Sequence, residues 1–156
     1  SFANIGQLLV LSTASVGLLN TKLEVPVSAE TFRPNVVLEG VTQPHEEDTW
    51  VHFRVGGHAL RVTGQCSRCT MVNINQRSGE QLREPLLTMA SYRRQLPGRQ
   101  PRGIVFGVYC SVVRGTPGEG GDATGNGRWL SVGDMLSAVV AESDGAAMIP
   151  AADAEA

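Results

Sequence analysis

The stretch at residues 50–63, WVHFRVGGHALRVT, predicts a β-hairpin from which the rest of the fold can be worked out. Polar and apolar residues alternate over residues 50–55, which is the pattern of a strand with one buried face. Gly56 and Gly57 then supply a two-residue turn, because glycine adopts positive φ angles without a steric penalty. Residues 58–63 return as the partner strand. The sheet is therefore expected to grow outward from this hairpin.

Other segments extend the β pattern, and two short helices interrupt it. Strands are predicted for residues 7–12, 35–39, 69–75, 104–113 and 129–135. A helix that Ser12, Thr13 or Ser15 can cap follows the first of these strands. Pro85 opens a second helix. Six or so short strands with only two helices favour a mainly β fold, either a barrel or a strongly curved sheet, over alternating β-α-β units.

Length and composition indicate one globular domain. The chain has 156 residues, of which 42% are hydrophobic, and this is enough for a core of its own. We expect the domain to occupy residues 1–142. The glycine-rich run at residues 114–127, RGTPGEGGDATGNG, lacks the lysine and the following helix of a phosphate-binding loop, so we expect a flexible insertion. The acidic tail at residues 143–156 is expected to be disordered.

Three features bear on where the chain works. Its longest apolar runs fall well short of the roughly 20 residues that a membrane-spanning helix needs. Its first residues show no signal or transit peptide. Its three cysteines give no disulfide framework and suit a reducing compartment. We therefore expect a soluble, cytoplasmic protein with no membrane partner.

The charge of the chain is distributed unevenly. A net charge of −2 argues against a general binder of nucleic acids or membrane surfaces. Residues 54–102 nevertheless contain nine arginines against two acidic residues. Guanidinium groups suit the bidentate capture of phosphate or carboxylate. A genome rich in arginine codons would produce the same overall count, so both explanations stay open.

Two cysteines lie three residues apart in GQCSRCTMV, residues 64–72. Such a pair is half of a structural zinc site, but no second pair exists. A thioredoxin-like redox pair needs a helix that opens at the first cysteine, whereas a strand is predicted here. Burial of both thiols as small apolar groups is a further alternative. Against burial, Arg68 would favour a neighbouring thiolate, and the strand predicted for residues 69–75 turns Cys69 away from the core.

A second group of candidate residues lies upstream, in TFRPNVV, residues 31–37. Pro34 is expected to hold Arg33 in an extended conformation, which would fix the direction of its guanidinium. Asn35 offers both a donor and an acceptor, the complement of a pterin or purine edge. The same residues would also serve as a capped strand start. The acids of HEEDTW, residues 45–50, read by charge alone as a solvated loop.

Taken in order, these motifs resemble a known family. The segments SFANIGQLLVLSTAS, FRPNVVLEG, EEDTW, GQCSRCTMVNINQRSG, FGVYC and LSVGD are similar to the MOSC domain at the C-terminus of eukaryotic molybdenum cofactor sulfurases. The mitochondrial amidoxime-reducing molybdoenzymes are similar relatives. The resemblance covers roughly residues 1–136, and its specificity comes from the order FRPN, EDxW, CxRC. It implies a MOSC-type β-barrel.

The resemblance implies a site for the molybdenum cofactor, a pterin whose dithiolene binds the metal and whose side chain ends in a phosphate. It makes Cys69 the molybdenum ligand and the catalytic residue, since thiolate is a soft ligand suited to a sulfur-rich centre. The other residues that it assigns to cofactor binding are Arg33, Asn35, Asp48, Ser67, Arg68 and Ser15. Cys66 is then structural or an auxiliary thiol, and Cys110 is left as a core residue.

The resemblance also implies a reaction and partners. We hypothesise the cofactor-binding part of a sulfurtransferase that exchanges an oxo ligand of molybdenum for sulfido and so activates xanthine dehydrogenase and aldehyde oxidase. Sulfur would come from L-cysteine through an upstream domain that depends on pyridoxal phosphate. That chemistry needs a Schiff-base lysine, and the single lysine, Lys22, has no such context. The alternatives are a molybdenum-dependent reductase of N-hydroxylated compounds and a non-catalytic β-barrel binding module.

Overall fold

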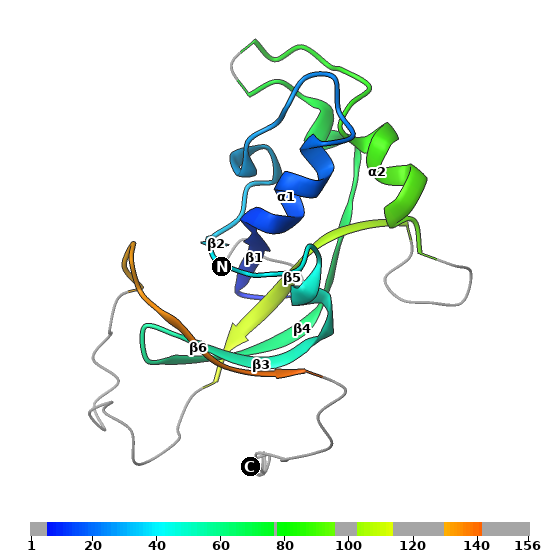
Figure 1. Ribbon diagram of the computed structural model, residues 1–156. Coiled ribbons are helices and arrows are strands. Elements are labelled where there is room, and N and C mark those ends of the chain that lie inside the picture. The colour runs from blue at the N-terminus through cyan, green and yellow to red at the C-terminus, as the bar shows by residue number, and fades with distance from the viewer. Residues whose placement is uncertain (1–5, 77, 96–102, 114–129, 142–156) are drawn as a thin grey trace, which may run out of the picture.

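A computed structural model describes residues 6–76, 78–95, 103–113 and 130–141, which form one curved, nearly closed six-stranded sheet with two α-helices at one end (Figure 1). The elements are β1 (Leu8–Ser12), α1 (Thr13–Asn20), η1 (Ala29–Phe32), β2 (Val36–Leu38), η2 (Glu46–Thr49), β3 (Trp50–Val55), β4 (His58–Arg68), η3 (Thr70–Asn73), α2 (Leu86–Arg93), β5 (Ile104–Val112) and β6 (Leu136–Ala141), where η marks a 3₁₀ helix. The strand order is β2-β1-β5-β4-β3-β6. The prediction of a mainly β, barrel-like fold with two short helices is therefore confirmed.

The predicted hairpin lies in the sheet between β5 and β6. β3 and β4 pair in antiparallel register from Val55 opposite His58, across a turn in which Gly56 and Gly57 have φ angles of 57° and 84°. β4 is longer than the predicted residues 58–63, because β5 pairs with it as far as Arg68. The long strand thus carries the first cysteine of the pair to the far end of the sheet.

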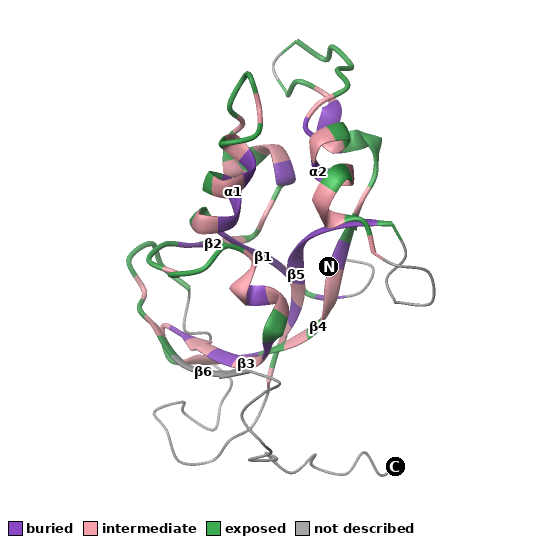
Figure 2. Ribbon diagram, turned by 45° about the vertical axis from the view of Figure 1, so that its right-hand side comes forward, coloured by how far each residue is buried: buried purple, intermediate pink, exposed green. Residues whose placement is uncertain are grey.

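Two groups of buried residues form the core, and Figure 2 shows where buried residues lie along the ribbon. One lies inside the curve of the sheet and consists of Val10, Leu38, Trp50, Phe53, Val55, Leu60, Val108 and Cys110. The other lies under the helices and consists of Leu11, Val16, Leu19, Phe32, Val72, Met89, Ile104 and Phe106. The assignment of Cys110 to the core is confirmed, since its side chain is fully buried and this burial raises the pKa of its thiol to about 12.

The strand predicted for residues 69–75 is wrong. The chain leaves the sheet after Arg68 and forms the 3₁₀ helix η3, from which Val72 packs into the core under the helices. Asn73 holds this turn against the start of α2, because its side-chain amide donates to the carbonyl of Arg83 (3.0 Å) and its side-chain oxygen accepts from the N–H of Leu86 (3.0 Å). Tertiary contacts therefore override the local alternation.

Two further predictions differ from the structure. The last strand begins at Leu136, so the part of residues 129–135 that is described, 130–135, is a loop with a turn at residues 132–133. Arg33 is not extended: its φ and ψ are 54° and 48°, in the left-handed region, because it closes η1 by donating its N–H to the carbonyl of Glu30 (2.9 Å). The following proline disfavours only the right-handed region for this residue. The predictions for residues 114–127 and 143–156 lie outside the described residues.

Candidate functional site

The cysteine pair lies at the end of β4, where side chains point alternately into the protein and out of it. Cys66 is buried with 3% of its surface exposed, whereas Ser67 and Cys69 are exposed and Arg68 lies between them, half-buried. Cys69 keeps an extended backbone, with φ −110° and ψ −178°, and forms the N-cap of η3. The prediction that Cys69 faces away from the core is confirmed, although a strand end and not a new strand places it there.

Arg68 fastens this strand end to two other elements. Its Nε and Nη2 both donate to the carbonyl of Phe106 in β5 (2.8 and 2.6 Å), and its Nη1 donates to the carbonyl of Phe32 in η1 (2.9 Å). The guanidinium also lies 5.4 Å from the centre of the Phe32 ring. Burial lowers the pKa of Arg68, and nearby cysteine and tyrosine groups oppose this shift. We call these contacts the Arg68 clamp.

The Arg68 clamp brings two predicted site residues together. Cys69 directly follows Arg68, and Arg33 directly follows Phe32, so the clamp joins the backbone next to each of them. Both side chains are exposed. The left-handed backbone of Arg33 is a strained conformation of the kind that is concentrated at functional sites. The structure thus brings the backbone beside an exposed thiol close to the backbone beside an exposed guanidinium, although the two residues are far apart in the sequence.

Asn35 extends the ladder between β1 and β2. Its N–H donates to the carbonyl of Leu9 (2.8 Å), and its side-chain oxygen accepts from the N–H of Leu9 (2.8 Å). This is the strand-start role that the sequence left open. Because the oxygen is used, the side-chain nitrogen is the group that could donate to a ligand.

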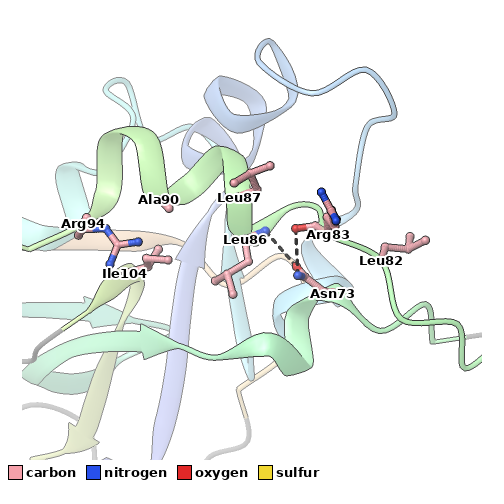
Figure 3. Close-up of a pocket in the computed structure, with 8 residues that line it drawn as sticks. All are labelled: Asn73, Leu82, Arg83, Leu86, Leu87, Ala90, Arg94 and Ile104. Carbon is pink, nitrogen blue, oxygen red and sulfur yellow. Dashed lines mark hydrogen bonds between the residues drawn. The ribbon is translucent and has the colours of Figure 1, made fainter.

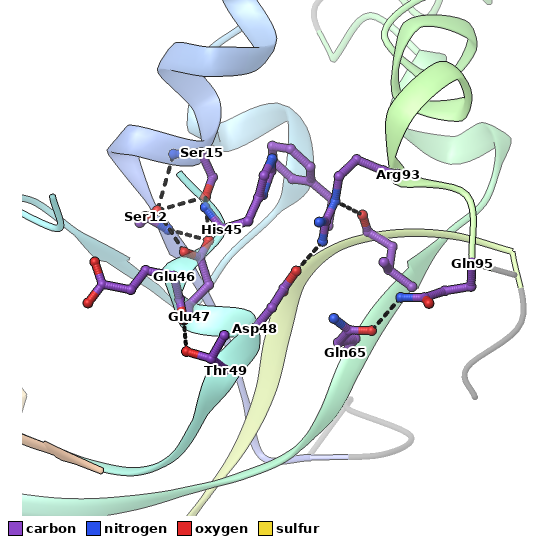
Figure 4. Close-up of polar contacts among 12 residues, drawn as sticks. Ser12, Ser15, His45, Glu46, Glu47, Asp48, Thr49, Gln65, Arg93 and Gln95 are labelled. Atoms are coloured by element: carbon purple, nitrogen blue, oxygen red, sulfur yellow. Dashed lines mark hydrogen bonds and ion pairs between the residues drawn. The ribbon is translucent and has the colours of Figure 1, made fainter. Parts of the chain in front are cut away.

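Ser15 lies in a buried network around Glu47 (Figure 4). The carboxylate of Glu47 is fully buried and accepts from the hydroxyl of Ser15 (2.7 Å) and from the hydroxyl and N–H of Ser12 (2.9 and 3.3 Å). The N–H of His45 also donates to the Ser15 hydroxyl (2.8 Å). The carboxylate therefore sits at the positive end of α1, where helix N-termini favour anions. Sequence reasoning missed Glu47, because its charge and its acidic neighbours do not distinguish a buried carboxylate from one in a solvated loop.

Asp48 ties η2 to the other helix. Its Oδ2 forms an ion pair with Nη2 of Arg93, the last residue of α2 (Figure 4). Arg93 Nε donates in turn to the carbonyl of Val105, the β5 residue that pairs with Ser67 of β4. Burial raises the pKa of Asp48, and the charge of Arg93 opposes that shift. Through Arg93, Asp48 is therefore connected to the β5 backbone that pairs with the end of β4. We call the segment from Cys66 to Cys69 at that end the cysteine turn.

Tyr109 is a second residue that sequence reasoning missed. It lies on β5 opposite Gly64 of β4. Its interaction with Cys66 and its partial burial raise the pKa of Tyr109 to about 12. Cys66 itself lies outside both groups of core side chains.

The geometry tests the three open interpretations of the cysteine pair. Three extended residues span about 10 Å between Cα atoms, whereas a disulfide needs roughly 4.4–6.8 Å, so Cys66 and Cys69 are not placed to form one. Among the described residues, no three side chains of His, Cys, Asp or Glu come together as a metal site. Burial of both thiols does not hold either, since Cys66 is buried and Cys69 is exposed.

Comparison with known proteins identifies the family. The MOSC domain family matches residues 1–137. The chain belongs to the MOSC domain family. The recognition made from the sequence motifs is therefore confirmed, and the barrel-like sheet described above is the form that this MOSC domain takes.

Curated relatives fall into two groups. A molybdenum cofactor sulfurase of Oryza sativa subsp. japonica is 40% identical over 147 residues, which are 87% of this chain and 17% of the relative. One of Solanum lycopersicum is 34% identical over 149 residues, with the same coverage of 87% and 17%. Human mitochondrial amidoxime-reducing component 1 is 36% identical over 116 residues, which are 70% of this chain and 33% of the relative. The chain thus spans about a sixth of the sulfurases and a third of the reducing component.

The described part of the chain contains no helix that is both long and apolar enough to span a membrane.

Proposed function

We propose that this MOSC domain is the cofactor-binding part of a molybdenum cofactor sulfurtransferase and holds the cofactor on the surface that Arg33 and Cys69 share. The observation that carries the proposal is the Arg68 clamp, which fastens the backbone beside both residues while leaving their side chains exposed. The similarity to full-length sulfurases over 87% of the chain supports the same reading.

The exposed side chains suit the parts of such a cofactor. The Cys69 thiolate would ligate molybdenum, because soft sulfur ligands suit a sulfur-rich metal centre. The Arg33 guanidinium would pair with the terminal phosphate. The Asn35 side-chain nitrogen and the Ser67 hydroxyl would donate to oxygen or nitrogen atoms of the pterin. When bound, the cofactor supplies the molybdenum on which an oxo ligand is replaced by sulfido.

The remaining predicted residues would hold in place the backbone and helices around this surface. The Arg68 guanidinium uses its donors on carbonyl oxygens, so we assign it to positioning Cys69 and Arg33. Asp48 acts through Arg93 and Ser15 through Glu47, which fixes α2 and α1 beside the sheet. Each of these residues would act on the cofactor through the backbone that it fixes.

The proposal extends to partners that lie outside this chain. A domain dependent on pyridoxal phosphate would deliver sulfur as a cysteine persulfide, a thiol reductant would supply the two electrons that bring this sulfur to the sulfide level, and xanthine dehydrogenase and aldehyde oxidase would be the enzymes activated. We place this activity in the cytoplasm. Incubation of the purified chain with L-cysteine and pyridoxal phosphate should yield no persulfide, and formation of one would contradict this division of labour.

The test of the site is cofactor retention. The chain is expressed in a host that makes the cofactor, molybdenum is measured by mass spectrometry, and the oxidised pterin is measured by fluorescence. Cys69→Ser should lose molybdenum, and Arg33→Ala should lose both metal and pterin. Arg61→Ala changes an exposed arginine on β4, the strand that ends just before Cys69, and should retain both. Full retention by Cys69→Ser and Arg33→Ala would refute the site.

A second function is favoured by one comparison, the 36% identity with human mitochondrial amidoxime-reducing component 1. A reductase of N-hydroxylated compounds would use the same thiol and the same cofactor. The cofactor-loaded chain would then reduce an amidoxime to an amidine with dithionite as electron donor. That activity, lost in Cys69→Ser, would replace the sulfurtransferase proposal.

A further inference from the structure

A groove of about 420 Å³ lies beside the cysteine turn, between α2, η3 and the start of β5 (Figure 3). Its lining residues are Asn73, Leu82, Arg83, Leu86, Leu87, Ala90, Arg94 and Ile104. Two of them connect it to the candidate site. Asn73 ends the 3₁₀ helix that Cys69 caps, and Ile104 pairs with Arg68 across the sheet. The groove and the exposed thiol therefore share one end of the molecule.

The floor of the groove is aliphatic, and part of it is unusually open to solvent. Leu86, Ala90 and Ile104 lie between α2 and the sheet, while Leu87 and Leu82 have 61% and 46% of their surface exposed. Single exposed leucines need no explanation, but aliphatic side chains gathered in one concave surface are typical of a place where another molecule binds.

The two ends of the groove carry positive charge. Figure 3 shows Arg94 near one end and Arg83 near the other, with Leu86 and Leu87 between them. Neither guanidinium is ion-paired with another described residue. The acid next to Arg83, Glu84, forms no ion pair with it and directs one carboxylate oxygen toward the N–H of Thr88 (3.0 Å). The arginine next to Arg94 is already paired with Asp48.

We infer that this groove is a docking site for an acidic, aliphatic peptide segment of a partner protein. Aliphatic side chains would cover the floor, and carboxylates on either side would pair with Arg83 and Arg94. A small anion would need only one of the arginines and none of the floor. Docking here would bring the partner beside Cys69, and the inference does not depend on which group Cys69 binds.

The test uses a defined probe, a fluorescein-labelled peptide with the sequence Glu-Leu-Leu-Asp-Glu-Leu-Leu-Glu, and fluorescence anisotropy with the full chain. The probe should bind, and binding should weaken about tenfold or more in the double variant Arg83→Glu with Arg94→Glu and fall as salt is raised. Arg61→Glu, a matched reversal on β4, should bind like the wild type. A peptide with serine for leucine and one with lysine for the acids should both bind more weakly.

Three results would overturn the inference. Equal binding by the double variant and the wild type would show that the arginines do not select the ligand. Equal binding of the serine peptide would reduce the site to a general attraction of anions. A dimer in sedimentation that the double variant dissociates would assign the groove to a second copy of this chain. Circular dichroism of each variant verifies that the fold is retained, and cofactor retention should be unaffected.

Discussion

Gly107 is the position at which one added methyl group should disturb both the sheet and the Arg68 clamp. It lies in β5 with a φ of +77°, a conformation that side chains other than glycine adopt only under strain. A Cβ atom there would lie 2.8 Å from the carbonyl oxygen of Val10 and 3.4 Å from Nη2 of Arg68. We therefore predict that Gly107→Ala destabilises the fold and displaces the Arg68 guanidinium.

The chain supplies a control that separates the two causes. Gly40 has the same φ of +77°, but a Cβ atom there would meet nothing within 4 Å. Gly40→Ala should thus cost only the backbone strain, about 1–2 kcal/mol of unfolding free energy. Gly107→Ala adds a collision with backbone, for which overpacking costs of about 1–3 kcal/mol are typical. The difference between the two variants should therefore be about 1–3 kcal/mol.

Urea denaturation followed by tryptophan fluorescence measures this difference. With a slope of about 2 kcal/mol per molar urea, the midpoint of Gly107→Ala should lie about 0.5–1.5 M below that of Gly40→Ala. If the cofactor proposal holds, Gly107→Ala should also retain less molybdenum than Gly40→Ala under conditions where both are folded. Equal midpoints for the two variants would refute the steric reasoning, whatever the cofactor result.

Three further predictions concern single side chains. Glu47→Gln should lower the free energy of unfolding by about 1–3 kcal/mol in urea, because the amide cannot accept from all three buried donors, whereas the exposed Glu39→Gln should change it by less than about 0.5 kcal/mol. Burial and the nearby Arg93 charge lower the pKa of His45 to about 4, so the folded state binds fewer protons than the unfolded state between pH 6.5 and 4. The free energy of unfolding should then decrease as the pH is lowered across that window, by about 1 kcal/mol after allowance for partial exposure. In His45→Gln it should decrease less. With a thiol reagent, Cys69 should react rapidly in the native protein and the two buried cysteines only after urea is added; rapid reaction of all three would contradict the burial of the other two.

The sheet was predictable where a strand's own residues decide its structure. The alternation along Trp50–Val55 and the two glycines after it define the hairpin, and Ile104–Val112 is apolar enough to be a strand in any arrangement. The prediction for residues 69–75 was wrong because their alternation resembles a strand, while Val72 packs into the core under the helices and Asn73 is held at the start of α2, outside the predicted segment. Local pattern cannot show such a competitor.

The candidate site was predictable in its exposed residues and not in what supports them. Arg33, Ser67 and Cys69 are exposed, as ligand-binding side chains must be. The role of Arg68 depends on backbone carbonyl groups 36 and 38 residues away. Every residue has a carbonyl, so the sequence does not show which of them will accept a hydrogen bond from Arg68. Glu47 was overlooked for the related reason that its partners are hydroxyl groups more than 30 residues upstream.

The adjacent acids Glu47 and Asp48 hold different helices, the first through the start of α1 and the second through the end of α2. The single 3₁₀ helix η2 thus anchors both α1 and α2. Slow amide exchange in α1 and α2 should accordingly be lost together, as one cooperative opening unit, while the β3–β4 hairpin keeps its protection. Motion that exposes one side of the candidate site would then also loosen the other.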